Sequence, residues 1–114
     1  MSLENFLKKL ELSPNSIEFE DTMSIIDAGY QYIPTVFKNG DVNNLAGENE
    51  GSCKLFYFAK LNKLSQQQTL SCFGKYYRED VLRNPTGSDH QNIRNFMRTA
   101  WEGIEFQGQA LIAK

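Results

Sequence analysis

The sequence predicts a single α+β domain, mostly helical, with about five helices and a small antiparallel sheet. Apolar residues recur at three- and four-residue spacing over most of the 114 positions, which is typical of amphipathic helices. The period changes to two in Gln31–Phe37, and short apolar runs close the chain, which predicts strands there. A composition of 40% apolar and 23% charged residues suits one compact core, so the domain is expected to span residues 1–114.

Two helices are expected before the first strand. Ser2 can cap the first helix, and Pro14 ends it because proline restricts the backbone before it. The second helix can begin at Ser16 and end near Gly29. Their apolar faces comprise Leu3, Phe6, Leu7 and Leu10 in the first helix and Phe19, Met23, Ile26 and Tyr30 in the second.

A strand and a long connection follow. Pro34 has no backbone N–H, so the strand Gln31–Phe37 is expected at a sheet edge. The segment Lys38–Gly51 is dense in asparagine, glycine and acidic residues and is expected to be irregular. Long loops often carry binding residues, so Asn43 and Asn44 are candidate contacts.

The middle of the chain predicts two more helices. Ser52–Leu64 is apolar almost all round, which favours a central buried helix, with a buried strand over Cys53–Ala59 as the alternative. Ser65 and Gln68 form a capping-box pattern that starts the next helix. The apolar face of that helix comprises Leu70, Phe73, Tyr77 and Val81. Gly74 lies inside it, so we expect another backbone or a ligand packed closely against this position.

The fifth helix holds the only histidine and the only tryptophan. Ser88 and Gln91 repeat the capping-box pattern, so this helix is expected to begin at Ser88. Its buried face comprises Ile93, Phe96, Met97, Ala100 and Trp101. At about 100° per residue, His90 and Arg94 fall at one edge of that face and Asn92 at the other. These positions are expected to be half-exposed, where binding or chemistry is possible, although a histidine in such a place is commonly just a hydrogen-bonded structural residue.

The C-terminus predicts a hairpin. Ile104–Phe106 and Gln109–Ile112 flank Gln107 and Gly108, which suit a turn. This hairpin is expected to add to Gln31–Phe37 as one small antiparallel sheet.

Composition argues against several classes of function. The net charge of −2, the pI near 5.4 and acids interleaved with the basic residues argue against nucleic-acid binding. No apolar run reaches the ~20 residues of a membrane span, and the N-terminus lacks the pattern of a cleaved signal peptide. Cys53, Cys72 and His90 are too few for a zinc site, and no phosphate-binding glycine loop is present, so no metal and no cofactor are expected. The two cysteines are expected to be reduced thiols in a cytoplasmic protein.

Several sequence blocks occur together in one order. They include NG, GSCK, CFG, YREDVL and DHQNIRNFM, within Ile17–Lys114. In these blocks the chain resembles the HopJ type III effector family. The resemblance implies a bacterial protein that is made in the cytoplasm and, in some members, delivered into plant cells by a type III apparatus without a cleaved signal peptide.

Two hypotheses of function follow. In the first, the protein binds a host or bacterial protein or a small ligand, through the Asn39–Gly51 loop and an edge formed by His90, Asn92 and Arg94. In the second, it is a cytoplasmic thiol-dependent hydrolase or transferase. The residues of that second hypothesis are Cys53 or Cys72 as nucleophile, His90 as base, and Asp89, Asn92 or Asn95 to orient the ring.

Overall fold

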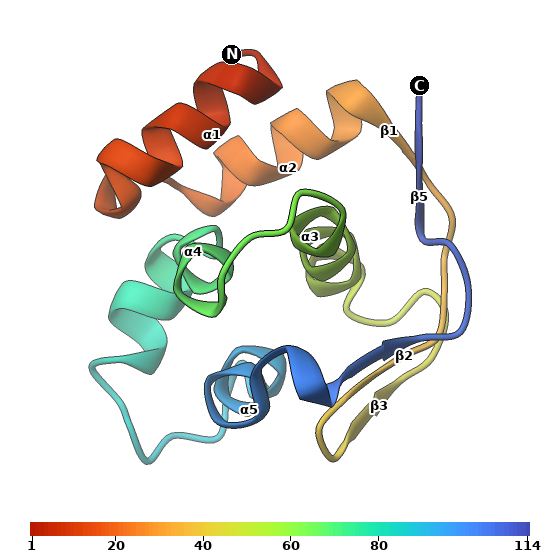
Figure 1. The fold of residues 1–114 in the computed structure, drawn as a ribbon. Helices are drawn as coiled ribbons and strands as arrows, with labels where there is room; N and C mark the ends of the chain where they lie inside the picture. The colour runs from red at the N-terminus through yellow and green to blue at the C-terminus, as the bar shows by residue number, and fades with distance from the viewer.

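The computed structural model describes residues 1–114. Five α-helices form, in the number that the sequence predicts: α1 (Leu3–Leu12), α2 (Phe19–Gly29), α3 (Glu50–Leu61), α4 (Gln66–Ser71) and α5 (Gln91–Thr99). Three further helical segments are present: the 3₁₀ turns η1 (Pro14–Ser16) and η3 (Ala100–Gly103), and the π-helix η2 (Tyr76–Val81). Helices α1 and α2 form one layer over α3, and α5 lies on the other side of α3 (Figure 1).

Helix α3 forms the centre of the core. Its residues Leu55, Phe56, Phe58 and Ala59 are fully buried, which confirms the predicted buried helix and excludes the strand alternative. The ring of Phe56 contacts Phe96 of α5 at 4.9 Å between centroids. Because α3 provides the central buried surface, the remaining helices need only one apolar face each.

The beginnings of α1 and α2 are set by local hydrogen bonds. The hydroxyl of Ser2 accepts from the backbone N–H of Asn5 at 3.1 Å, as expected of the predicted cap. Helix α2 does not begin at Ser16, which lies in η1. It begins after Glu18, whose backbone N–H donates to the Asp21 carboxylate at 3.0 Å.

The predicted strand Gln31–Phe37 is two strands. Strand β1 (Tyr30–Tyr32) and strand β2 (Phe37–Asn39) are separated around Pro34, which cannot donate to a sheet. The hydroxyl of Thr35 donates to the Ile33 carbonyl at 2.7 Å, so this break forms its own local turn.

The C-terminal hairpin does not form, because its two arms join different sheets. Strand β4 (Ile104–Phe106) pairs with β2, and strand β5 (Leu111–Ala113) pairs with β1. All pairings are antiparallel, as predicted, but the result is a two-stranded sheet β1-β5 and a three-stranded sheet β3-β2-β4. Strand β3 (Val42–Asn44) lies inside the segment expected to be irregular, and Gly40 at φ +59° makes the turn before it.

Gly74 divides the predicted fourth helix. The capping box of Ser65 and Gln68 is present, with its two hydrogen bonds at 3.0 and 3.1 Å. The helix then ends at Ser71, and Gly74 takes a φ of +61°. A Cβ at Gly74 would lie 2.6 Å from the backbone nitrogen of Phe19, which confirms that another backbone packs closely against it. This close approach joins η2 to the start of α2.

Candidate functional site

Helix α5 begins three residues later than predicted. His90 is its N-cap residue, with φ 50° and ψ 50°, and Gln91 is its first residue. The Ser88–Gln91 capping box is therefore wrong; instead the side-chain amide of Gln91 donates to the Ser88 carbonyl oxygen. The helix also ends early, at Thr99, because Ala100 has a φ of +52°. Trp101 consequently lies in η3.

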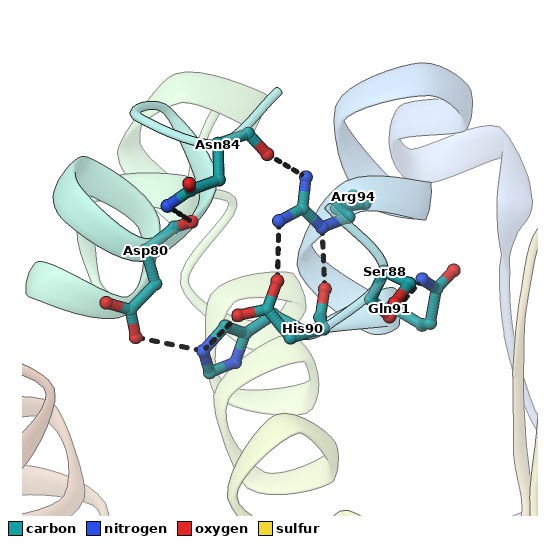
Figure 2. A network of polar contacts seen from close by, with 7 residues as sticks. Asp80, Asn84, Ser88, His90, Gln91 and Arg94 are labelled. Atoms are coloured by element: carbon teal, nitrogen blue, oxygen red, sulfur yellow. Dashed lines mark hydrogen bonds and ion pairs between the residues drawn. The ribbon is translucent and has the colours of Figure 1, made fainter. Parts of the chain in front are cut away.

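The His90 ring connects the start of α5 to the π-helix η2. Its Nε2 lies 3.0 Å from the Asp80 carboxylate and 3.8 Å from that of Asp89. Its ring centroid lies 5.2 Å from that of Tyr76. With 28% of its side chain exposed, His90 is half-buried as predicted, although it precedes the helix and does not lie on its face. Figure 2 shows the ring turned towards Asp80.

Arg94 fixes the loop that precedes α5. Its Nε donates to the Asp89 carbonyl at 2.6 Å, and its Nη1 donates to the Asn84 carbonyl at 2.8 Å. Its Nη2 donates to the Asp89 carboxylate at 2.6 Å, and this hydrogen bond lowers the pKa of Asp89. Gly87 leaves room for the guanidinium, since a Cβ there would lie 2.7 Å from Nη2. Figure 2 shows the guanidinium between Asn84 and the beginning of α5, where it binds the protein's own loop.

The asparagines form a buried amide network between α5 and the β2-β3 hairpin. Asn92 donates to Asn44 Oδ1 at 3.0 Å, and Asn92 Oδ1 accepts from Asn39 at 3.0 Å and from Asn44 at 3.2 Å. Asn95 donates to the Asn39 carbonyl at 2.9 Å. Asn44 and Asn92 are buried and bonded to each other, so their amides face the interior, whereas Asn43 is exposed on β3. The expected half-exposed position of Asn92 is therefore wrong.

The structure does not assemble the thiol and imidazole of the second hypothesis. Cys53 is buried and donates to the Thr35 carbonyl at a sulfur–oxygen distance of 3.7 Å. Cys72 is fully buried, and burial raises the pKa of its thiol to about 12; burial also raises the pKa of Cys53. No hydrogen bond joins either sulfur to His90, whose Nε2 is paired with Asp80. Both cysteines are free thiols in the core, and neither has the lowered pKa of an activated nucleophile.

A cavity of about 400 Å³ opens between η2 and α5. It is lined by Val81, Leu82, Pro85, Gly87, Gln91, Arg94, Asn95, Met97 and Arg98. Leu82 and Met97 are exposed there, at 47% and 38%. Periodicity assigned Met97 to the core. Arg98 was not among the predicted site residues, although its place one turn after Arg94 was a signal that could have indicated it.

Arg98 is held in place at this cavity. Its Nη2 donates to the side-chain oxygen of Asn95, which belongs to the buried amide network. No ion pair involves Arg98. The cavity therefore presents exposed apolar side chains beside a positioned guanidinium that no carboxylate neutralises.

No group of three or more histidine, cysteine, aspartate or glutamate side chains lies close enough together to hold a metal ion. None of the helices combines the length and apolar character that crossing a membrane requires.

Comparison with known proteins agrees with the sequence resemblance. The structure is similar to the crystal structure of an unknown-function protein, VPA0580, with a TM-score of 0.98 and 55% sequence identity over 100% of this chain and 95% of that chain. No curated protein matches the chain. The HopJ type III effector protein family matches residues 3–111, which is nearly the whole length. The chain therefore belongs to the HopJ type III effector protein family.

Proposed function

We propose that this protein binds a peptide segment of a partner protein in the cavity between η2 and α5. The peptide carries an apolar side chain next to a carboxylate. The observation that supports this most is the combination of exposed Leu82 and Met97 with the unneutralised guanidinium of Arg98. Exposed apolar side chains grouped around a concave site are a common feature of protein contact surfaces.

The fixed walls of the cavity support the same proposal. Arg94 holds the Asn84–Asp89 loop on one side, and the Asp80–His90 contact ties that side to η2. A site whose walls are already ordered loses little conformational entropy when a ligand binds. In this proposal, His90 and Arg94 shape the contact surface while Arg98 makes the charged contact.

Charge supports an acidic partner. Residues 53–114 carry nine lysines and arginines against five acidic residues, a net charge of +4, whereas the whole chain is at −2. A carboxylate can form two parallel hydrogen bonds with a guanidinium, which gives direction as well as attraction.

The family also supports a proposal about location. We propose that the protein is made in the bacterial cytoplasm and delivered to host cells by a type III apparatus, as the name of the family describes. Residues 1–30 fused to a reporter enzyme should carry it out of a strain with a working apparatus. Retention of the reporter in that strain, with a known secreted fusion exported in parallel, contradicts delivery.

The binding proposal is tested with a labelled peptide of alternating leucine and glutamate and a matched peptide of leucine and glutamine. Fluorescence polarisation should give a Kd about tenfold lower for the acidic peptide, which corresponds to about 1.4 kcal/mol. Arg98→Gln should remove this preference and Arg98→Lys should keep part of it. Arg83→Gln is the matched control, because Arg83 is exposed, pairs with Glu79 and does not line the cavity. Equal affinity for both peptides, or an unchanged preference in Arg98→Gln, overturns the proposal.

A further inference from the structure

A second hollow lies between the end of α3 and the η3-β4 segment, separate from the peptide cavity. Its volume is about 300 Å³, and it is lined by Ala59, Lys60, Lys63, Leu64, Trp101 and Ile104. Ala59 and Leu64 are buried, whereas Trp101 and Ile104 are half-buried and Lys60 and Lys63 are exposed. The hollow thus has an apolar interior and a cationic rim, and it shares no lining residue with the first cavity.

Trp101 is held in a fixed position at this hollow. Its indole N–H donates to the Leu64 carbonyl at 3.1 Å, so the polar end of the side chain is satisfied within the protein. Its ring meets Phe96 edge-on, at 5.1 Å and 81°. The half-buried indole therefore offers an aromatic surface that is already ordered before any ligand arrives.

The two lysines on the rim have no acidic partner. No ion pair involves Lys60 or Lys63. The ammonium of Lys60 lies over the ring of Phe106, at 5.7 Å from its centroid, and this aromatic ring is the charged group's only contact of this kind. The acids next to the lining residues in sequence, Glu102 and Glu105, do not line it.

The backbone at Lys63 is unusual. Lys63 has a φ of +55°, in the left-handed region that glycine favours. Its N–H donates to the Lys60 carbonyl, and the following N–H, of Leu64, donates to the Ala59 carbonyl, so Lys63 is the left-handed residue that follows the C-cap Asn62 of α3. A glycine would end the helix with less strain, yet the chain carries a lysine there and so places a charge on the rim.

We propose that this hollow is a second binding site, for a small aromatic carboxylate. The apolar interior and the ordered indole accept an aromatic ring, and the two free ammonium groups attract the carboxylate. The volume is at the lower end of the range for small-molecule sites, so the ligand is about the size of one ring with a short side chain. This site is independent of the peptide cavity, and either proposal can hold without the other.

The test uses the single tryptophan as its reporter. 3-Phenylpropionate is titrated into the full-length protein, and the indole is excited at the red edge of its absorption so that tyrosine contributes little. The fluorescence should change and saturate, with a Kd of about 1 mM or below. The uncharged 3-phenylpropanamide, which keeps the ring and the chain, should bind about tenfold more weakly because it lacks the carboxylate.

Variants test whether the two lysines, and not other charges on the surface, bind the carboxylate. The double variant Lys60→Gln with Lys63→Gln should weaken 3-phenylpropionate about tenfold and leave the amide unchanged. Lys8→Gln, an exposed lysine of α1 without an ion pair, is the control and should bind like the wild type. Arg98→Gln should also leave this titration unchanged, because Arg98 lies at the other cavity.

Three results overturn the proposal. One is the absence of a saturable change in indole fluorescence at ligand concentrations tenfold above the expected Kd. Another is equal binding of the carboxylate and the amide. The third is wild-type affinity in the double lysine variant while its circular dichroism spectrum shows a normal fold.

Discussion

Truncating Asn92 tests whether the buried amides hold the protein together or serve a ligand. Asn92→Ala removes three side-chain hydrogen bonds, one donated to Asn44 and two accepted from Asn39 and Asn44. A buried hydrogen bond contributes about 1 kcal/mol net, so the loss from these bonds is about 3 kcal/mol.

The loss of stability would be larger if the groups that bond to the Asn92 side chain were left without any partner. The Asn39 amide keeps its bond to the Asn92 carbonyl at 2.8 Å, and Asn44 Oδ1 still accepts from Asn49 at 2.8 Å. The Asn44 amide keeps only a 3.4 Å contact with the Phe37 carbonyl. Because each group that loses its bond to the Asn92 side chain retains another partner, the full cost of a newly unsatisfied buried group is avoided and about 3 kcal/mol remains the expected loss.

Urea unfolding followed by far-ultraviolet circular dichroism measures this free energy. For a domain of this size, a loss of about 3 kcal/mol lowers Tm by about 12 °C. Asn43→Ala is the matched control on the neighbouring, exposed position of β3, and it should change stability by less than about 0.5 kcal/mol. An Asn92→Ala variant as stable as Asn43→Ala would refute the structural role assigned to the network.

Three further predictions concern backbone, thiol and charge. Gly74→Ala should lower the free energy of unfolding by about 3 kcal/mol, because Gly74 has a positive φ and a Cβ there would lie 2.6 Å from a backbone atom. Gly29→Ala is the control and should change this free energy by less than about 1 kcal/mol, because nothing lies within 4 Å of its Cβ position. Equal effects of the two variants in a urea titration contradict this prediction. Cys72, with a thiol pKa of about 12, should react with dithionitrobenzoate at pH 8 only as fast as the protein unfolds, and rapid labelling of the native protein at this position contradicts its burial. Arg94 lowers the pKa of Asp89 below the ordinary value of 3.8. The ionised Asp89 carboxylate therefore stabilises the fold above pH 3.8, and this stabilisation is lost as the pH falls through the lowered pKa of the folded state. The stability difference between wild type and Asp89→Asn should therefore shrink as the pH falls below 3.8, and a difference that is constant across this range argues against the ion pair.

The two capping-box patterns show where prediction from sequence succeeds and where it stops. Ser65 and Gln68 form the box, and both of its hydrogen bonds lie within the segment itself. At Ser88 the same pattern fails, because Arg94 binds the carbonyl and the carboxylate of Asp89 and the chain turns at His90 before the helix begins. A local pattern cannot reveal contacts made by a side chain five residues further on.

Strand pairing was predictable in kind but not in detail. The period-two alternation of Gln31–Phe37 and the short apolar runs at the C-terminus correctly indicated antiparallel pairing between the two regions. The division at Pro34 places β1 and β2 in different sheets, because β1 pairs with β5 and β2 pairs with β4. These pairings depend on the tertiary path of the chain, which the local pattern does not report. Gly74 was the opposite case, since a glycine inside a helical pattern indicated that a backbone or a ligand packs closely against it, and the backbone of Phe19 lies there.

The surroundings of the candidate site were predicted better than the cavity beside it. The edge of the apolar face correctly placed His90 at a half-buried position, but its partner Asp80 comes from η2, ten residues earlier. The exposure of Met97 arises because the cavity replaces core packing on that side of α5. Periodicity reports which face of a helix is apolar, and it does not report whether another element covers that face.

Amide chemical-shift mapping tests the central claim most directly, that the η2-α5 cavity binds an acidic peptide. The isotope-labelled protein is titrated with the leucine–glutamate peptide, and the backbone amide shifts are followed residue by residue. The account predicts saturating changes concentrated at Val81, Leu82, Gln91, Met97 and Arg98, and much smaller changes with the leucine–glutamine peptide. Unchanged chemical shifts at these five amides, or equal changes with both peptides, would contradict the proposed binding of an acidic peptide.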